Sequence, residues 1–213
     1  MKLYKITDQN NKTRAGKINE TVWGPNVTHT ASGSGTELCT DGVIHAYLDP
    51  RLAVILNPIH AVIVYPKLWE AEGEIVVRDG QLLVGVKSLT TIKEIPLPVI
   101  TDEQKVKFAI LCALEVYQEE TFVSWANKWL SGEDHSGVVK DAAGAWSRRA
   151  NITNWSDPHT SAHCAASAAN TLSEPGSEKV FVWAAYTMNS ATWALAAVNK
   201  YIDLIAILDK AMK

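Results

Sequence analysis

The sequence predicts an α+β protein: an N-terminal, mostly antiparallel β domain with a short helix, followed by an α-helical C-terminal domain rich in alanine and tryptophan. Within residues 1–98, several runs alternate between apolar and polar residues, which is the period of a half-buried strand. Within residues 99–213, apolar residues recur at helical spacing, and six of the chain's eight tryptophans lie there among alanines. Pro-Leu-Pro at 96–98 marks the boundary between the two domains.

The first strand is predicted at residues 2–7, where apolar and polar side chains alternate. The next thirty residues are rich in Asn, Thr, Gly and Ser, a composition typical of turns. Short strands are expected within this segment near residues 22–23 and 27–30. A further strand is expected at residues 43–47.

Asp49-Pro50 combines a favourable N-cap residue with proline at the first helical position, which predicts a short helix through Leu56. Asn57-Pro58 is expected to end this helix. Asp79-Gly80 has the composition of a hairpin turn. β-Branched and apolar runs predict four further strands, at residues 59–65, 68–77, 81–87 and 89–95.

The helical part begins at Thr101, which forms a capping box with Gln104. Thr121 is predicted to cap a second helix that ends at Ser131-Gly132, and Phe122, Trp125 and Trp129 share one side of it. The remaining predicted helices are a third at about 138–150, a fourth from Asp157-Pro158 to about Leu172, and either one long helix over 178–212 or two that meet near Asn189-Ser190.

Composition excludes several classes of partner. The net charge of −3 argues against a nucleic-acid polymer, whose phosphates require a basic face. The N-terminal residues contain no apolar leader, and no stretch is long and apolar enough to span a membrane. The three cysteines are odd in number and far apart, which indicates a reducing compartment. We therefore expect a soluble cytoplasmic protein without a membrane partner.

The segment 37–60 concentrates side chains that carry chemistry, among them Cys39, His45, Tyr47 and His60. Zinc accepts cysteine and histidine ligands, but the spacing of these residues matches no zinc motif. A second interpretation is a small-molecule pocket, because His45 and Tyr47 are two residues apart and therefore share a strand face. A third is that both residues are structural groups at a strand-to-helix corner. The sequence leaves the three interpretations open.

Two further clusters lie in the helical part. Trp146 with Arg148 and Arg149 suits an anionic ligand held against an indole, although arginines at a helix C-terminus also interact favourably with the helix dipole. These residues are also candidates to close over the segment 37–60 and form a shared pocket. His159 and His163 have a spacing that can chelate a metal, but the same spacing arises on solvated helix starts.

No motif of catalysis is present: the sequence has no nucleophile elbow, no P-loop and no H-E-x-x-H. We therefore predict no catalytic residue, no metal and no cofactor. The predicted ligand-binding residues come from the first strand, the segment 37–60 and the third helix: Lys5, Thr7, His45, Tyr47, His60, Trp146, Arg148 and Arg149.

Several segments of the first 98 residues carry a resemblance to a known group of proteins. LYKITD (3–8), ELCTDG (37–42), IHAYLDPRLA (44–53), LNPIH (56–60), LWEAEGE (68–74) and LTTIKEIPLP (89–98) resemble a family of uncharacterised bacteriophage and prophage proteins. Members of this family pair a short α+β domain with an Ala/Trp-rich helical tail. The resemblance implies a viral gene product that acts in the cytoplasm of a bacterial host, and it transfers no activity.

A more distant similarity is to the ADP-ribosyltransferase fold. That fold opens with a strand bearing histidine or arginine, followed by an aromatic strand and later by a catalytic glutamate. The strand at 3–7 and the segment 42–53 fill the first two places, with Lys5 where the family has histidine or arginine. Glu72 is the candidate for the glutamate. The similarity implies a pocket for a nucleotide or an ADP-ribose-like molecule.

These observations lead to an expected function and two alternatives. We expect a phage-encoded protein that binds a small nucleotide-derived molecule without catalysis and so sequesters an immune signal of the host. The first alternative is an enzyme that modifies or cleaves a nucleotide with an ADP-ribosyltransferase-like domain. The second is an inhibitor that binds a host protein through its tryptophan-rich helices. A tail this rich in alanine and tryptophan can pair between subunits, and symmetric dimers are the commonest oligomer, so a homo-oligomer is an open alternative to a monomer.

Overall fold

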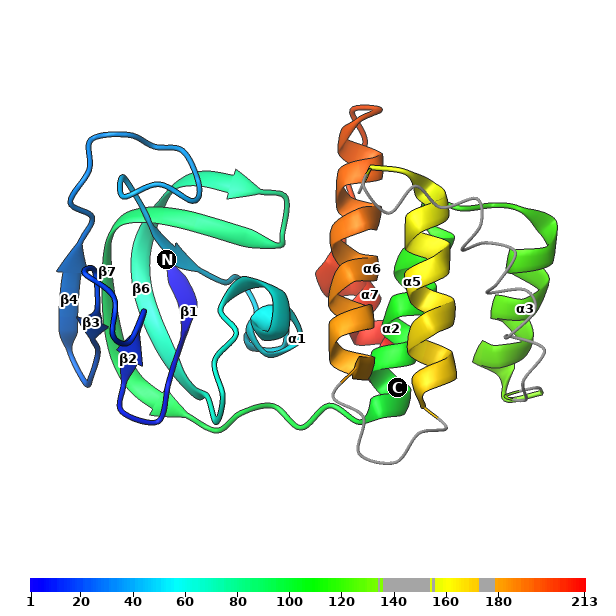
Figure 1. The fold of residues 1–213 in the computed structure, drawn as a ribbon, viewed down its shortest axis with the longest axis horizontal. Coiled ribbons are helices and arrows are strands. Elements are labelled where there is room, and N and C mark those ends of the chain that lie inside the picture. The colour runs from blue at the N-terminus through cyan, green and yellow to red at the C-terminus, as the bar shows by residue number, and fades with distance from the viewer. Residues whose placement is uncertain (134, 136–153, 155, 173–178) are drawn as a thin grey trace. The chain divides into compact units, whose positions relative to one another are not determined.

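The computed structural model describes residues 1–133, 135, 154, 156–172 and 179–213. The chain forms two compact units, Met1–Val99 and Ile100–Lys213 (Figure 1). The first unit contains antiparallel strands and one helix, and the second contains helices. The α+β fold class predicted from the sequence is therefore confirmed.

The first unit is built on a five-stranded antiparallel sheet in the order β1-β6-β7-β4, with β5 also paired to β7. Figure 1 shows β6 and β7 as two long, curved strands that form the centre of this sheet. A separate two-stranded hairpin lies between β1 and β4 in the chain. The strands span Lys2–Thr7 (β1), Lys12–Thr13 (β2), Thr21–Val22 (β3), Val27–Thr30 (β4), Ile44–Ala46 (β5), Lys67–Asp79 (β6) and Leu83–Ile95 (β7).

The sheet curls until its first strand meets the end of β5. The Tyr4 amide donates to the Tyr47 carbonyl, and the Tyr47 amide donates to the Tyr4 carbonyl, each at 2.9 Å. This bridge links β1 to the segment that follows β5, so that β1, β6, β7 and β5 form a nearly closed ring of strands. The core inside includes Leu3, Trp23 and Ala46. The closure therefore places β1 and β5, which are forty residues apart, side by side.

Helix α1 spans Pro50–His60, and Asp49 caps it as the sequence predicts, accepting from the Arg51 amide. The prediction that Asn57-Pro58 ends the helix is wrong, because the helix continues for two residues beyond Pro58. The Asn57 side chain instead fixes the exit of the helix, since its amide group both donates to the Ile63 carbonyl and accepts from the Ile63 amide.

The prediction of a strand at residues 59–65 is also wrong. These residues form the last turn of α1 and a loop, in which Val62, Val64 and Tyr65 are exposed. The strands predicted at 81–87 and 89–95 are one continuous strand, β7, whose long pairing with β6 spans both. The hairpin turn at Asp79-Gly80 is confirmed, with Gly80 in the left-handed conformation that glycine readily adopts.

The second unit begins with α2 (Asp102–Leu114), whose predicted capping box between Thr101 and Gln104 is present in both directions. Helix α3 (Glu120–Ser131) ends at Gly132 as predicted, but Thr121 is not its cap. The carboxylate of Glu119 takes this place and accepts from the Phe122 amide. The helix predicted at about 138–150 lies outside the described residues.

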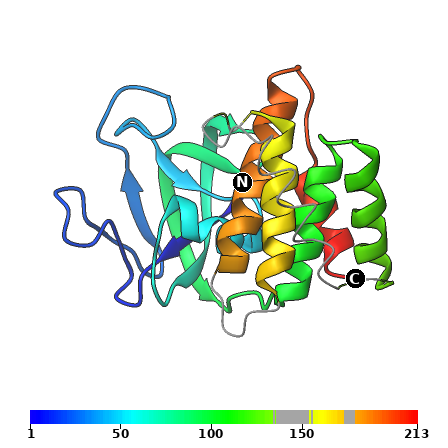
Figure 2. The same ribbon diagram turned by 45° about the vertical axis from the view of Figure 1, so that its right-hand side comes forward.

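The remaining helices are α5 (Pro158–Thr171), α6 (Lys179–Ala196) and α7 (Leu204–Ala211). Of the two alternatives for residues 178–212, the structure has two helices, but they do not meet near Asn189-Ser190. Both residues are buried within α6, and the chain turns at Asn199 instead. Helices α2, α5 and α6 lie side by side in Figures 1 and 2. Phe122, Trp125 and Trp129 pack into the core of this unit with alanines of α2 and α5. Among the described residues, no helix has the length and apolar character needed to cross a membrane.

The helices α2 and α3 are capped by different residues, Thr101 and Glu119. Thr101→Ala is expected to lower the free energy of unfolding by about 1 kcal/mol, because the Gln104 amide loses its acceptor. Thr121→Ala is expected to cost less, because Glu119 is the acceptor at the start of α3. Urea denaturation followed by helical circular dichroism measures both. A larger loss for the Thr121 variant would contradict the assignment of the cap.

Candidate functional site

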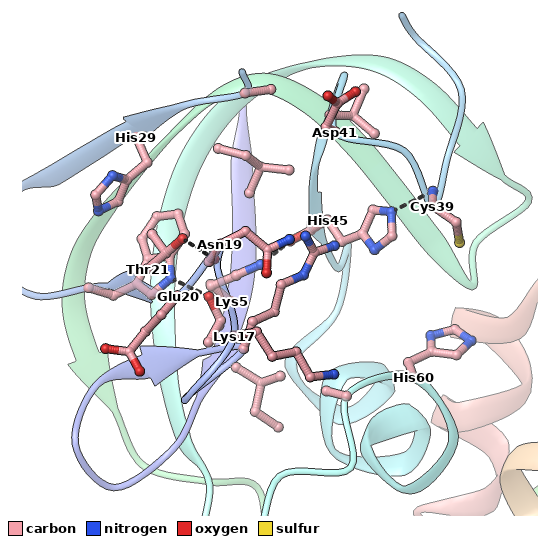
Figure 3. Close-up of a pocket in the computed structure, with 18 of the residues that line it drawn as sticks. Lys5, Lys17, Asn19, Glu20, Thr21, His29, Cys39, Asp41, His45 and His60 are labelled. Atoms are coloured by element: carbon pink, nitrogen blue, oxygen red, sulfur yellow. Dashed lines mark hydrogen bonds between the residues drawn. The ribbon is translucent and has the colours of Figure 1, made fainter. Parts of the chain in front are cut away.

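A cavity of about 600 Å³ opens in the first unit (Figure 3). Its walls come from β1, the hairpin around β2 and β3, β4, the loop 31–43, β5 and the end of α1. Figure 3 shows His29 and His60 on opposite sides of the cavity, with Lys5 and His45 between them. The volume falls in the range of sites for small molecules.

Lys5 forms the buried part of the cavity wall. Only 9% of its surface is exposed, and its ammonium nitrogen donates to the His45 carbonyl at 2.7 Å. The same nitrogen lies 5.3 Å from the centre of the Trp23 ring. Burial, reinforced by the positive charge of Arg14, lowers the pKa of Lys5 to about 7. The sheet closure causes this burial, because it places the carbonyl of β5 over the side chain of β1.

The hairpin that carries Arg14 is fixed by side chains of its own segment. The Asp8 carboxylate accepts from the amides of Asn10 and Lys12 and so forms the turn that leaves β1. Trp23 then returns the chain to the core, donating its indole N–H to the Thr13 hydroxyl at 3.0 Å. Arg14 is the residue after Thr13. It is exposed at the rim of the cavity, and its backbone has a φ of 54°.

The loop 31–43 forms the opposite wall and is held by Lys87 of β7. The Lys87 ammonium donates to four carbonyl oxygens of this loop, including those of Ser34 at 3.2 Å and Gly42 at 2.7 Å. The two sides of the loop approach so closely that a Cβ on Gly42 would lie 2.1 Å from the Gly35 carbonyl oxygen. Glycine at position 42 therefore allows the loop to fold tightly enough for one lysine to bind both sides.

His45 connects this loop to the cavity. Its Nε2 accepts from the Cys39 amide at 3.0 Å, as the dashed line in Figure 3 shows. Because an amide can only donate, Nε2 carries no proton and the neutral ring is protonated at Nδ1. Burial is the main reason that the pKa of His45 falls to about 4, and the charges of Lys5, Arg14 and His60 lower it further. His45 therefore offers the cavity an uncharged N–H donor at neutral pH.

Tyr47 and His60 supply the aromatic surface. Their rings stack with centroids 6.3 Å apart and an interplanar angle of 17°. Tyr47 is almost fully buried, which raises the pKa of its phenol. His60 lies at the end of α1 and is exposed overall. Its ring is nevertheless partly removed from water, which lowers the pKa of His60. The exposed part of this stacked pair gives an apolar ring surface at the cavity rim.

The charges around the cavity are unbalanced. Arg14 and Lys17 have no hydrogen-bond or ion-pair partner for their side chains among the described residues. The carboxylate of Glu20 is already held by the Lys12 ammonium at 2.6 Å and by the Gly16 amide at 2.8 Å. It points away from Lys5 in Figure 3. Asp41 is exposed at the rim. The cavity therefore presents basic groups that no nearby carboxylate neutralises.

Of the residues predicted to bind a ligand, Lys5, His45, Tyr47 and His60 line the cavity. Thr7 does not line it, because its hydroxyl accepts from the Trp69 indole in the buried interior. Trp146, Arg148 and Arg149 lie outside the described residues, as does the shared pocket that they were expected to form. The candidate glutamate, Glu72, is exposed on β6 and is not among the residues that line the cavity.

Sequence reasoning missed Arg14, Lys17 and Trp23, which lie in a polar segment that matches no motif. Trp23 is the signal that was available, because an isolated indole in such a segment indicates that the turn packs onto a core. The zinc interpretation gains no support: among residues whose placement is described, no three histidine, cysteine or acidic groups are arranged to hold a metal.

The burial of Lys5 makes a prediction about stability. In the unfolded chain Lys5 binds a proton up to its ordinary pKa of 10.5, whereas the folded protein releases it near pH 7. Lys5 therefore lowers stability as the pH falls from about 10.5 to 7. Lys5→Met removes this effect and should raise the free energy of unfolding at pH 7 by on the order of 1 kcal/mol or more. The gain should shrink at pH 10, and a gain that is independent of pH would contradict the burial of a free amine.

His45 gives a second prediction. Its lowered pKa means that the unfolded state binds the proton first, so the stability associated with a neutral His45 is lost as the pH falls from 6.5 to about 4. Histidine NMR should show His45 titrating near pH 4 with Nδ1 protonated. In Arg14→Asn the pKa should rise, because one repelling charge is gone. An unchanged pKa in that variant would show that Arg14 does not act on this cavity.

Comparison with known proteins assigns neither a family nor a function to this chain. No family model, no curated protein and no solved structure matches this chain. The resemblances to a phage family and to the ADP-ribosyltransferase fold therefore stay predictions, and functional inference depends on the geometry of the cavity.

Proposed function

We propose that the first unit binds a small nucleotide-derived anion in this cavity and retains it without chemical change. The observation that carries the proposal is the gathering of Lys5, Arg14 and Lys17 around a cavity where the available carboxylates are exposed or already paired. An anion is the ligand that suits such a cavity, because it neutralises the basic groups and accepts their hydrogen bonds. The volume of the cavity, about 600 Å³, is sufficient for a nucleotide.

The aromatic side of the cavity supports a ligand with a ring. Tyr47 and His60 are already stacked, and a planar base can extend this stack from the exposed side of His60. His45 adds a neutral N–H donor, which suits a hydroxyl or a phosphate oxygen. Trp23 is a less suitable platform, because the Lys5 ammonium lies over its ring.

Retention without turnover is the second part of the proposal. A transferase of the kind that the sequence resembles requires a glutamate beside the ligand, and Glu72 is not among the residues that line this cavity. The two lining carboxylates, Glu20 and Asp41, lie on the exposed hairpin and loop. A phage protein with this property would lower the free concentration of a nucleotide signal used in host defence.

Thermal denaturation with a panel of nucleotides tests the proposal. At a concentration a hundred times its dissociation constant, a ligand that binds the folded state adds about 2.7 kcal/mol of stability. ADP-ribose, cyclic dinucleotides and nucleoside monophosphates form the panel, and mass spectrometry of the recovered ligand reports turnover. We expect at least one large increase in melting temperature with the ligand unchanged.

Matched variants locate the binding. Arg14→Asn should raise the dissociation constant of the ligand at least about tenfold, since a hydrogen-bonded charge is lost. Asparagine tolerates the left-handed backbone at this position, so the fold should be retained. Lys93→Gln is the control, because it removes one positive charge of the same unit outside the cavity. A chemically altered ligand would favour the enzyme instead. Absence of any shift across the panel would refute nucleotide binding and favour a protein partner.

A further inference from the structure

We propose that the cavity selects ligands by a phosphate group with at least two negative charges, a pyrophosphate or a terminal phosphate, bound between Arg14 and Lys5. This inference names the ligand class for the function proposed above and rests on that function. Ligands with only one phosphate, in the form of a cyclic or internal diester, are therefore not preferred, because a phosphodiester carries only one negative charge.

The number of basic groups favours a doubly charged anion. Arg14 and Lys17 sit on the exposed hairpin with unengaged side chains, and Lys5 lies in the buried part of the same cavity. Arg14 is near enough to Lys5 for its charge to act on the amine. An anion with one charge is satisfied by Arg14 alone and leaves Lys5 unpaired. An anion with two charges neutralises Arg14 and Lys5, and Lys17 adds a further positive charge at the cavity.

Lys5 has hydrogen-bonding capacity left for such an anion. When protonated it carries three donors, one of which is directed to the His45 carbonyl. Trp23 covers one side of the ammonium. Because the group is nine-tenths buried, its attraction to a phosphate is weakly screened by water. His45 can donate through Nδ1 to the same ligand without adding a charge.

Binding should therefore be linked to proton uptake. Without ligand, Lys5 is mostly neutral at pH 8, because burial and Arg14 lower its pKa to about 7. A phosphate beside the amine favours the charged form and raises this pKa. His45 stays neutral at that pH. The other titratable and charged groups that face the cavity are Arg14, Lys17, Glu20, His29, Cys39, Asp41, Tyr47 and His60.

The experiment compares nucleoside 5′-monophosphates with their 3′,5′-cyclic counterparts by isothermal titration calorimetry of the full chain at pH 8. Each pair shares the same base and sugar, but at this pH the open form carries two charges and the cyclic form one. Inorganic pyrophosphate is the probe without a base. We expect the open forms to bind at least about tenfold more tightly, as for one additional charged hydrogen bond. Pyrophosphate should bind competitively with them.

Titrations in two buffers with different ionisation enthalpies count the protons. The wild-type protein should take up close to one proton for each monophosphate at pH 8, where Lys5 is mostly neutral and the phosphate already carries both charges. Lys5→Arg should remove the uptake while retaining a positive charge, because arginine is already protonated at pH 8. The proton count of the wild-type protein tests the role of Lys5 by itself, so the test stands even where this variant does not fold.

The outcomes separate this inference from the function on which it rests. Equal affinity for open and cyclic forms would overturn the charge selection and leave nucleotide binding intact. Selection of open forms without proton uptake at pH 8 would overturn the role of Lys5. Failure of every nucleotide to bind would overturn the proposed function together with this inference.

Discussion

Two backbone hydrogen bonds between Tyr4 and Tyr47 determine the character of the first unit. They join β1 to the segment after β5. Because β1 also pairs with β6, β6 with β7, and β7 with β5, this contact closes the ring of strands. Closure places Lys5 against the His45 carbonyl and buries most of its side chain. An open sheet would leave Lys5 at an edge in water with an ordinary pKa. The chemistry of the cavity thus depends on a contact in which no side chain takes part.

The burial of Lys5 lowers the stability of the free protein, which is consistent with a role in binding. A buried amine beside Arg14, for which the described residues supply no carboxylate partner, reduces stability in the absence of a ligand. Ordinary structural lysines in this protein are arranged differently: Lys87 is surrounded by carbonyl oxygens, and Lys105 is paired with Asp102. The contrast supports the proposal that the anionic partner of Lys5 is a ligand from outside the chain. An anionic ligand is the partner that matches its charge and position.

Local patterns in the sequence predicted much of the fold, because strand alternation, the Thr101 capping box and the Asp79-Gly80 turn depend on neighbouring residues. The errors arose where distant contacts decide. The apolar run after Pro58 resembles a strand, but Asn57 holds Ile63 in a loop. Lys5, His45, Tyr47 and His60 were chosen by residue type and resemblance, and they line one cavity. Arg14 was missed, because its relation to Lys5 exists only after the hairpin folds onto the closed sheet.

An NMR titration of the Lys5 side chain, followed through the carbon next to its amine, shows directly whether this amine is buried without a neutralising group. In the free protein we predict a pKa near 7, and in the presence of a saturating nucleoside monophosphate a clearly higher value. A pKa near the ordinary 10.5 in the free protein would mean that water or an acidic group reaches the amine. That result would contradict the account of an unneutralised cavity on which the proposed function is built.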